Sequence, residues 1–197
     1  MKSTRHGLGI LLLGMLAGVV ATGTACAAAV AWRMDAGSSE LKFTPRLAGG
    51  EFEGRFERFE TTVRFDPADL AHSSLQVVVD LSSARTGDGD RDTALHGVDF
   101  FAISRWPQAR FSSTSIRALG GDRYVAAGKL TLRDQTREVS LPFRFDLAAP
   151  ANRTAHLTGA TTIKRLQFDV GQGEWRGTEW LDDAVRVEFS VALESAR

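Results

Sequence analysis

Histidines are the first side chains to consider, because neutral imidazole is the commonest metal ligand in proteins. His72, His96 and His156 lie far apart and in three different predicted elements, without the close spacing of a metal motif. The single cysteine, Cys26, falls in a segment that we expect to be removed. We therefore expect no metal site.

Carboxylates near Trp175 and Trp180 are the next candidates for chemistry, because two carboxylates that flank a sugar ring are the machinery of a glycosidase. A polar loop with structural tryptophans is the commoner origin of such a run. The residues are Asp169, Glu174, Glu179, Asp182 and Asp183. The stretch 171–173 lacks the Gly-Lys-Ser/Thr of a phosphate loop, and 112–114 lies in a predicted strand without a nucleophile elbow. We expect no catalytic residue, no cofactor and no enzyme.

The N-terminal segment, Met1 to Ala29, is typical of a cleaved signal peptide. Lys2 and Arg5 precede an apolar run over 8–20, and small residues follow, so we expect cleavage after Ala27 or Ala29 and export to the periplasm. The alternative is a lipid-modified Cys26, but residues 23–25 are Gly-Thr-Ala, without the bulky aliphatic residue of a lipoprotein signal.

The remaining chain, residues 30–197, is long enough for one domain and contains no linker-like tract. The precursor is formally neutral, and loss of Lys2 and Arg5 leaves about −2 (0 minus 2), which argues against a nucleic-acid binder. Without cysteine, stability must come from a closed and well-packed sheet.

Apolar and polar residues alternate through most of this domain, which predicts strands with one buried face. We expect about eight or nine of them, over 40–44, 51–57, 59–65, 75–81, 109–117, 124–132, 138–147, 154–164 and 184–193. Short turns join them, at 66–69 and at a hairpin over 133–137 in which Asp134 is expected to be left-handed. A meander of this size without open edges is a closed, all-β antiparallel barrel.

The stretch from Arg91 to Thr114 interrupts the alternation. Residues 90–96 have the marks of a short helix, which Asp88 or Asp90 can cap and Gly97 can end. The following pair, Phe100 and Phe101, is too apolar to be left in water. We expect this segment to form a lid or plug against the open end of the barrel.

Several motifs follow one another in order from Trp32 to about Leu193. They are Trp32-Arg33-Met34-Asp35, Leu41-Lys42-Phe43, Gly54-Arg55-Phe56, Val63-Arg64-Phe65-Asp66, Asp99-Phe100-Phe101, Trp106-Pro107, Phe111-Ser112-Ser113-Thr114, Gly128-Lys129-Leu130-Thr131-Leu132 and Gly171-Gln172-Gly173-Glu174-Trp175. As a set they resemble the YceI-like family of periplasmic polyisoprenoid-binding proteins. Asp134 and Asp169 depart from the family pattern, which often has glycine at both places, and Asp169 puts the path of the terminal loop in doubt.

The resemblance implies a lipocalin-like barrel with one short helical segment at one end, whose channel holds a long isoprenoid or another amphiphilic lipid. The inferred inward-facing residues are rich in Phe, Val and Leu, but apolar content alone does not separate a hollow channel from a filled core. The expected channel residues are Phe52, Phe56, Phe65, Val77, Val79, Phe100, Phe101, Trp106, Phe111, Phe143, Phe145, Phe168 and Trp175. Arg91, Asp92 and His96 are candidates for a lipid head group at the mouth, with a solvated helix face as the alternative.

The function we expect is that of a periplasmic carrier for a polyisoprenoid, a quinone or a fatty amide. Two alternatives stay open: an accessory of a membrane redox or envelope-stress system that presents a quinone-like ligand, and an enzyme acting on such lipids. Expected partners are the lipid itself and, in addition, transient membrane contact or a homodimer, with no nucleic acid.

Overall fold

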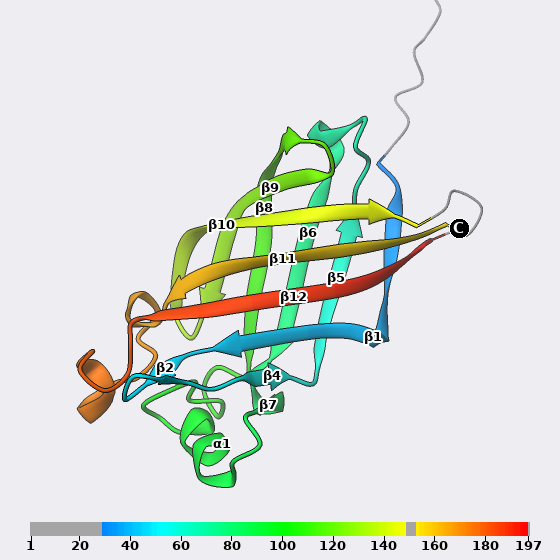
Figure 1. The fold of residues 1–197 in the computed structure, drawn as a ribbon. Coiled ribbons are helices and arrows are strands. Elements are labelled where there is room, and N and C mark those ends of the chain that lie inside the picture. The colour runs from blue at the N-terminus through cyan, green and yellow to red at the C-terminus, as the bar shows by residue number, and fades with distance from the viewer. Residues whose placement is uncertain (1–28, 149–152, 197) are drawn as a thin grey trace, which may run out of the picture.

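Eight long strands form a closed antiparallel β-barrel, which confirms the expected fold class (Figure 1). The computed structural model describes residues 29–148 and 153–196, so the expected signal peptide lies outside the described residues except for Ala29. The strands are β1 (Ala31–Thr44), β5 (Phe59–Arg64), β6 (Ser74–Asp80), β8 (Gln108–Gly120), β9 (Arg123–Leu132), β10 (Gln135–Leu147), β11 (Thr154–Lys164) and β12 (Ala184–Ser195). They pair as a meander, and β12 pairs with β1 to close the barrel.

The shorter elements extend one end of the barrel, except for the 3-10 turn between β5 and β6, which packs against the core at the other end. A shift of register between Asp35 and Glu40 divides β1, and its first half pairs with β5 while its second half pairs with β4 (Gly54–Phe56). The other short elements are β2 (Arg46–Leu47), β3 (Gly50–Glu51), β7 (Ala84–Arg85), α1 (Gly89–His96) and the 3-10 turns η1 (Leu70–His72), η2 (Leu81–Ser83), η3 (Arg165–Phe168) and η4 (Gly173–Arg176). The strand expected over 51–57 is broken, and Phe52 lies between β3 and β4.

The hairpin between β9 and β10 corrects one prediction. Leu132 pairs with Gln135, and the left-handed residue of the two-residue loop is Arg133, with a φ of 56°, rather than Asp134. The Arg133 side chain explains this position, because its Nη1 donates to the carbonyl oxygens of Phe100, at 2.8 Å, and of Asp169. These two bonds hold the loop residue against the neighbouring segments.

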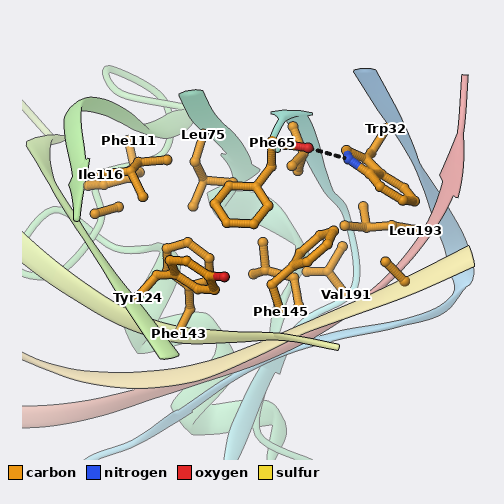
Figure 2. Packing of buried hydrophobic residues seen from close by; sticks show 14 residues of the cluster. Trp32, Phe65, Leu75, Phe111, Ile116, Tyr124, Phe143, Phe145, Val191 and Leu193 are labelled. Carbon is orange, nitrogen blue, oxygen red and sulfur yellow. Dashed lines mark hydrogen bonds between the residues drawn. The ribbon is translucent and has the colours of Figure 1, made fainter. Parts of the chain in front are cut away.

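The interior of the barrel is divided into two clusters of buried side chains. The first is a dense aromatic cluster around Phe65, at the end where β1 begins and β12 ends (Figure 2). The second cluster surrounds a cavity at the other end, toward α1. The filled half and the hollow half therefore lie one behind the other along the same barrel.

Candidate ligand cavity

A cavity of about 230 Å³ occupies the half of the barrel nearer α1, and apolar side chains form almost all of its wall. The strand period of two produces this wall, since alternate residues point inward. On β6, for example, Val77 and Val79 line the cavity while Val78 does not. An apolar cavity of this kind favours a hydrocarbon over water.

The segment after β7 covers the hollow end, as Figure 1 shows for α1. The carboxylate of Asp88 accepts hydrogen bonds from the backbone N–H of Asp90 and Arg91, and Gly97 ends the helix, which confirms the predicted caps. Leu95 of α1 lines the cavity. A helix of this length is only marginally stable by itself, so its contact with the barrel opening through Leu95 helps to hold it.

Phe100 and Phe101 follow the helix and also line the cavity. The backbone N–H of Phe101 donates to Leu95 at 3.0 Å, and its ring lies 6.0 Å from that of Phe56. Trp106, expected beside them, is outside the cavity wall: its ring lies 4.5 Å from the Arg105 guanidinium and 4.8 Å from that of Arg133. Two cations over its faces hold this indole away from the interior.

The opposite end of the cavity is closed by aromatic rings. Leu75, Phe111, Leu157 and Val191 belong both to the cavity wall and to the dense cluster, so they form the cavity floor. Beyond this floor the rings of Phe65, Tyr124, Phe143 and Phe145 lie 4.5 to 5.6 Å apart, centre to centre. The interior at that end is a filled core (Figure 2).

The thirteen expected channel residues are thus divided between the wall and other positions. Seven of them line the cavity: Phe52, Phe56, Val77, Val79, Phe100, Phe101 and Phe111. Six lie outside its wall: Phe65, Phe143 and Phe145 in the filled core, Phe168 buried behind the wall, Trp175 with its ring tilted against that of Phe100 at 5.8 Å, and Trp106. The period-two pattern predicted correctly which of these strand residues point into the barrel. It did not predict their position along the barrel axis.

Several wall residues were not among the expected set. Phe43, Phe59, Leu130, Val139, Val187 and Phe189 are examples, and each is an inward residue of a predicted strand. The period-two pattern that predicted the strands would have found them, because each follows or precedes another inward residue by two positions.

The expected head-group residues lie on α1. The Arg91 guanidinium lies 4.5 Å from the ring centre of Phe52, a wall residue, and pairs with Asp88 at 3.5 Å. Asp92 instead accepts two hydrogen bonds from Thr86, both at 2.7 Å, and ties the helix to the segment after β7. His96 has a buried Nε2 that finds no hydrogen-bond partner in the described part of the chain.

A buried arginine that sequence reasoning missed fastens the loop after β11. Arg165 is 3% exposed, and its guanidinium donates to the carbonyl oxygens of Val170, Gly171, Gly177, Leu181 and Asp182. Burial lowers the pKa of Arg165, while the nearby charges of Asp183 and Asp182 act in the opposite direction. The side chain borders the cavity with its donors already occupied.

Asp169, where the family pattern often has glycine, adopts a backbone conformation that glycine favours. Its φ of 54° and ψ of 29° are left-handed, the conformation that glycine adopts freely and that aspartate tolerates. Of the carboxylates weighed as a catalytic pair, Asp183 accepts the backbone N–H of Leu166 at 2.9 Å and so supports η3.

Metal-binding clusters and membrane-spanning helices are two further features to consider within residues 29–148 and 153–196. Across these ranges, three or more His, Cys, Asp or Glu side chains do not come together as a metal site would require. Within the same ranges, every helix is too short or too polar to cross a bilayer.

Comparisons with known proteins agree with this architecture. BcnA of Burkholderia cenocepacia is 32% identical, with a TM-score of 0.77 over 81% of this chain and 98% of that one. A polyisoprenoid binding domain from Saccharophagus degradans shares the fold at 17% identity, with a TM-score of 0.65 over 85% of this chain and 99% of that one. A UPF0312 protein of Vibrio cholerae is 29% identical over 69% of this chain and 72% of its own length. The model of the YceI-like domain matches residues 32–193, and the chain therefore belongs to the YceI-like family.

Proposed function

We propose that this protein binds one amphiphilic lipid with its hydrocarbon chain inside the barrel, and that it carries this lipid in the periplasm. The observation that carries the proposal is the apolar cavity of about 230 Å³ beneath the lid. A chain that buries roughly 500 Å² of apolar surface gains about 12 kcal/mol gross. Association and ordering cost several kcal/mol, so useful affinity remains without covalent chemistry.

The class of ligand is an isoprenoid, an isoprenoid quinone or a fatty amide. The name of the polyisoprenoid binding domain from Saccharophagus degradans, which has the same fold, supports a lipid of this kind. The periplasmic location rests on the signal-peptide pattern of residues 1–29.

Binding rather than catalysis is supported by the chemistry of the wall. Its charged residues, as far as the described chain shows, are Arg110 and Arg165. Arg165 is saturated by five carbonyl oxygens, and Arg110 donates to Gln108 at 2.5 Å. Over most of the cavity wall a ligand would therefore contact hydrocarbon groups, which cannot accept or donate a proton.

In this proposal the polar head of the lipid lies at the mouth of the cavity, beside α1. Arg91 is the best-positioned group for an anionic or carbonyl head, because its guanidinium already lies over the wall residue Phe52. The buried Nε2 of His96, which has no hydrogen-bond partner among the residues that the structure describes, is a second polar group on the same helix. The carboxylate of Asp92 already accepts two hydrogen bonds from Thr86, so we assign Asp92 to holding the helix in place.

Organic extraction of the purified exported protein, followed by mass spectrometry, tests the proposal. We expect a lipid at close to one molecule per chain, and its head group will separate a carrier from a redox accessory, which requires a quinone. Val77→Trp fills the cavity and should lose the lipid, whereas Val78→Trp, on the outer face of the same strand, should keep it. If neither the extract nor added lipids show binding, the proposal is wrong.

A further inference from the structure

The cavity has a blind end, and this feature bears on which lipids fit. Phe65, Tyr124, Phe143 and Phe145, here called the aromatic plug, are between 1% and 6% exposed. Trp32 packs edge-on against Phe145 at 5.3 Å, and its indole N–H donates to the carbonyl oxygen of Phe65 at 3.0 Å. Aromatic rings packed in this way leave no path for a chain beyond the floor.

The width of the cavity depends on three glycines in strands. Gly54, Gly128 and Gly159 each lie beneath the ring of a wall phenylalanine: Phe43, Phe111 and Phe189 respectively. A methyl group added to Gly128 would lie 2.7 Å from the Phe111 ring, and one added to Gly54 or Gly159 would also overlap the ring above it. Each ring therefore fills the place of a missing side chain and stays against the wall.

The register shows that two of these contacts are directly opposed cross-strand pairs, whereas Gly128 is opposed by Ser113 and meets the Phe111 ring diagonally. Gly54 pairs directly with Phe43, and Gly159 pairs directly with Phe189. The Cβ atoms of directly opposed residues are only about 5 Å apart on the same face. Without a side chain on one partner, the other can lie flat across the strand instead of projecting into the cavity.

The depth can be estimated from β12, where the wall runs from Val185 to Val191. Six residue steps span roughly 20 Å along a strand, and a barrel tilt of about 40° reduces this to roughly 15 Å along the axis. This is about half of the roughly 30 Å hydrocarbon core of a bilayer, which is the depth of one leaflet.

We propose that the barrel measures its ligand: the aromatic plug limits the accepted hydrocarbon to about the length of one membrane acyl chain, and the three glycine–phenylalanine pairs keep the bore open for it. This rests on the proposed lipid binding and adds a length limit and a width limit to it. A longer polyisoprenoid would place only its terminal part inside, and the remainder would emerge beside α1.

A chain-length series tests the proposal. A set of amphiphiles with one head group and unbranched chains of increasing length is measured by displacement of a fluorescent fatty acid, below the micelle concentration. We expect affinity to rise by about fourfold per methylene and then to level off at the depth of the cavity. The double variant Phe143→Leu and Phe145→Leu, which shortens the plug, should move this break to longer chains.

A separate set of variants tests the glycine–phenylalanine pairs. Gly54→Ala should push the Phe43 ring into the bore and lower affinity by about tenfold or more at every chain length. The three atoms nearest to the added methyl all belong to the Phe43 ring, and folding is checked by circular dichroism. Adding Phe43→Leu should restore binding, because the smaller side chain releases the overlap. Gly50→Ala is the matched control, since its added methyl meets only an ordinary contact at 3.6 Å.

The outcomes separate this inference from the proposed function. If no member of the series binds, the length limit is wrong, and the proposed function is wrong as well if the exported protein also contains no lipid. If binding rises without a break through chains twice the cavity depth, or the break stays in place when the plug is shortened, the length limit is wrong and lipid binding stands. If Phe43→Leu fails to rescue a folded Gly54→Ala variant, the glycine pairs do not set the width.

Discussion

At the scale of single residues, Arg165 shows how a charge can be buried in the wall of an apolar barrel. A guanidinium has five N–H donors in a fixed planar fork, and the five carbonyl oxygens around Arg165 match that number. Those carbonyls belong to a loop with η4 and several glycines, which has little regular hydrogen bonding of its own. One side chain therefore replaces the backbone ladder that a strand would have supplied.

Replacing Arg165 with lysine should destabilise the protein by about 3 kcal/mol, because lysine has three donors and at least two buried carbonyl oxygens lose a charged partner. Denaturant unfolding measures this. Arg117→Lys, on an exposed position of β8, is the control and should stay within about 0.5 kcal/mol of the parent. Equal stability of the two variants would show that the loop does not depend on the buried guanidinium.

The types of residue in the strands predict which side chains point inward, but they do not predict which of these side chains line the cavity. Alternation predicts that Phe65 and Phe111 both point inward, and both do, but one is in the filled core and the other lines the cavity. Their difference is axial position in a barrel whose stagger depends on all eight strands together. The Arg165 cage was equally hidden, because its partners are backbone carbonyls that carry no sequence signal.

At the scale of elements, local patterns were sufficient wherever the chain is regular. The predicted strand over 154–164 has the bounds of β11, and the predicted helix over 90–96 is α1 to within one residue. The prediction was wrong where a contact with residues distant in sequence determines the local backbone conformation. Arg133 rather than Asp134 takes the left-handed place because its side chain binds Phe100 and Asp169, far away in sequence.

The lid helix depends on its N-terminal cap. The backbone N–H of Arg91 donates to the carboxylate of Asp88 and lowers the pKa of Asp88, with the Arg91 charge acting in the same direction. Since the folded pKa lies below the ordinary value of about 3.9, the cap is complete above that pH and is lost only as the pH falls through the lower, folded value. The lid should therefore keep its cap throughout the neutral range.

Asp88→Ala removes the cap and should speed amide hydrogen exchange across 89–96 at neutral pH, together with dissociation of bound lipid. Asp88→Asn is the control, because asparagine caps as well as aspartate. Hydrogen exchange read by mass spectrometry measures the first effect and fluorescence stopped-flow the second. An alanine variant with parental exchange in α1 would mean that tertiary packing, through Leu95 and Phe101, holds the lid by itself.

At the scale of the whole molecule, the two halves of the barrel have different tasks. The filled half contains the aromatic plug, and β1 closes on β12 along both halves, so packing and strand closure stabilise the barrel without a disulfide. The hollow half gives up packing to form a cavity, and each empty volume in a core lowers stability. Bound lipid should therefore return part of the stability that the hollow half lacks.

This coupling predicts that a lipid raises the melting temperature of the whole domain. A ligand that binds only the folded state adds about 2.7 kcal/mol at a free concentration 100 times its Kd. For a domain of this size each kcal/mol shifts Tm by about 2–4 °C, so we expect a rise of about 5–10 °C in differential scanning calorimetry. Val78→Trp should show the same rise, whereas Val77→Trp, with its cavity filled, should show almost none. An equal rise in both variants would place the lipid on the outer surface and would contradict a site inside the barrel.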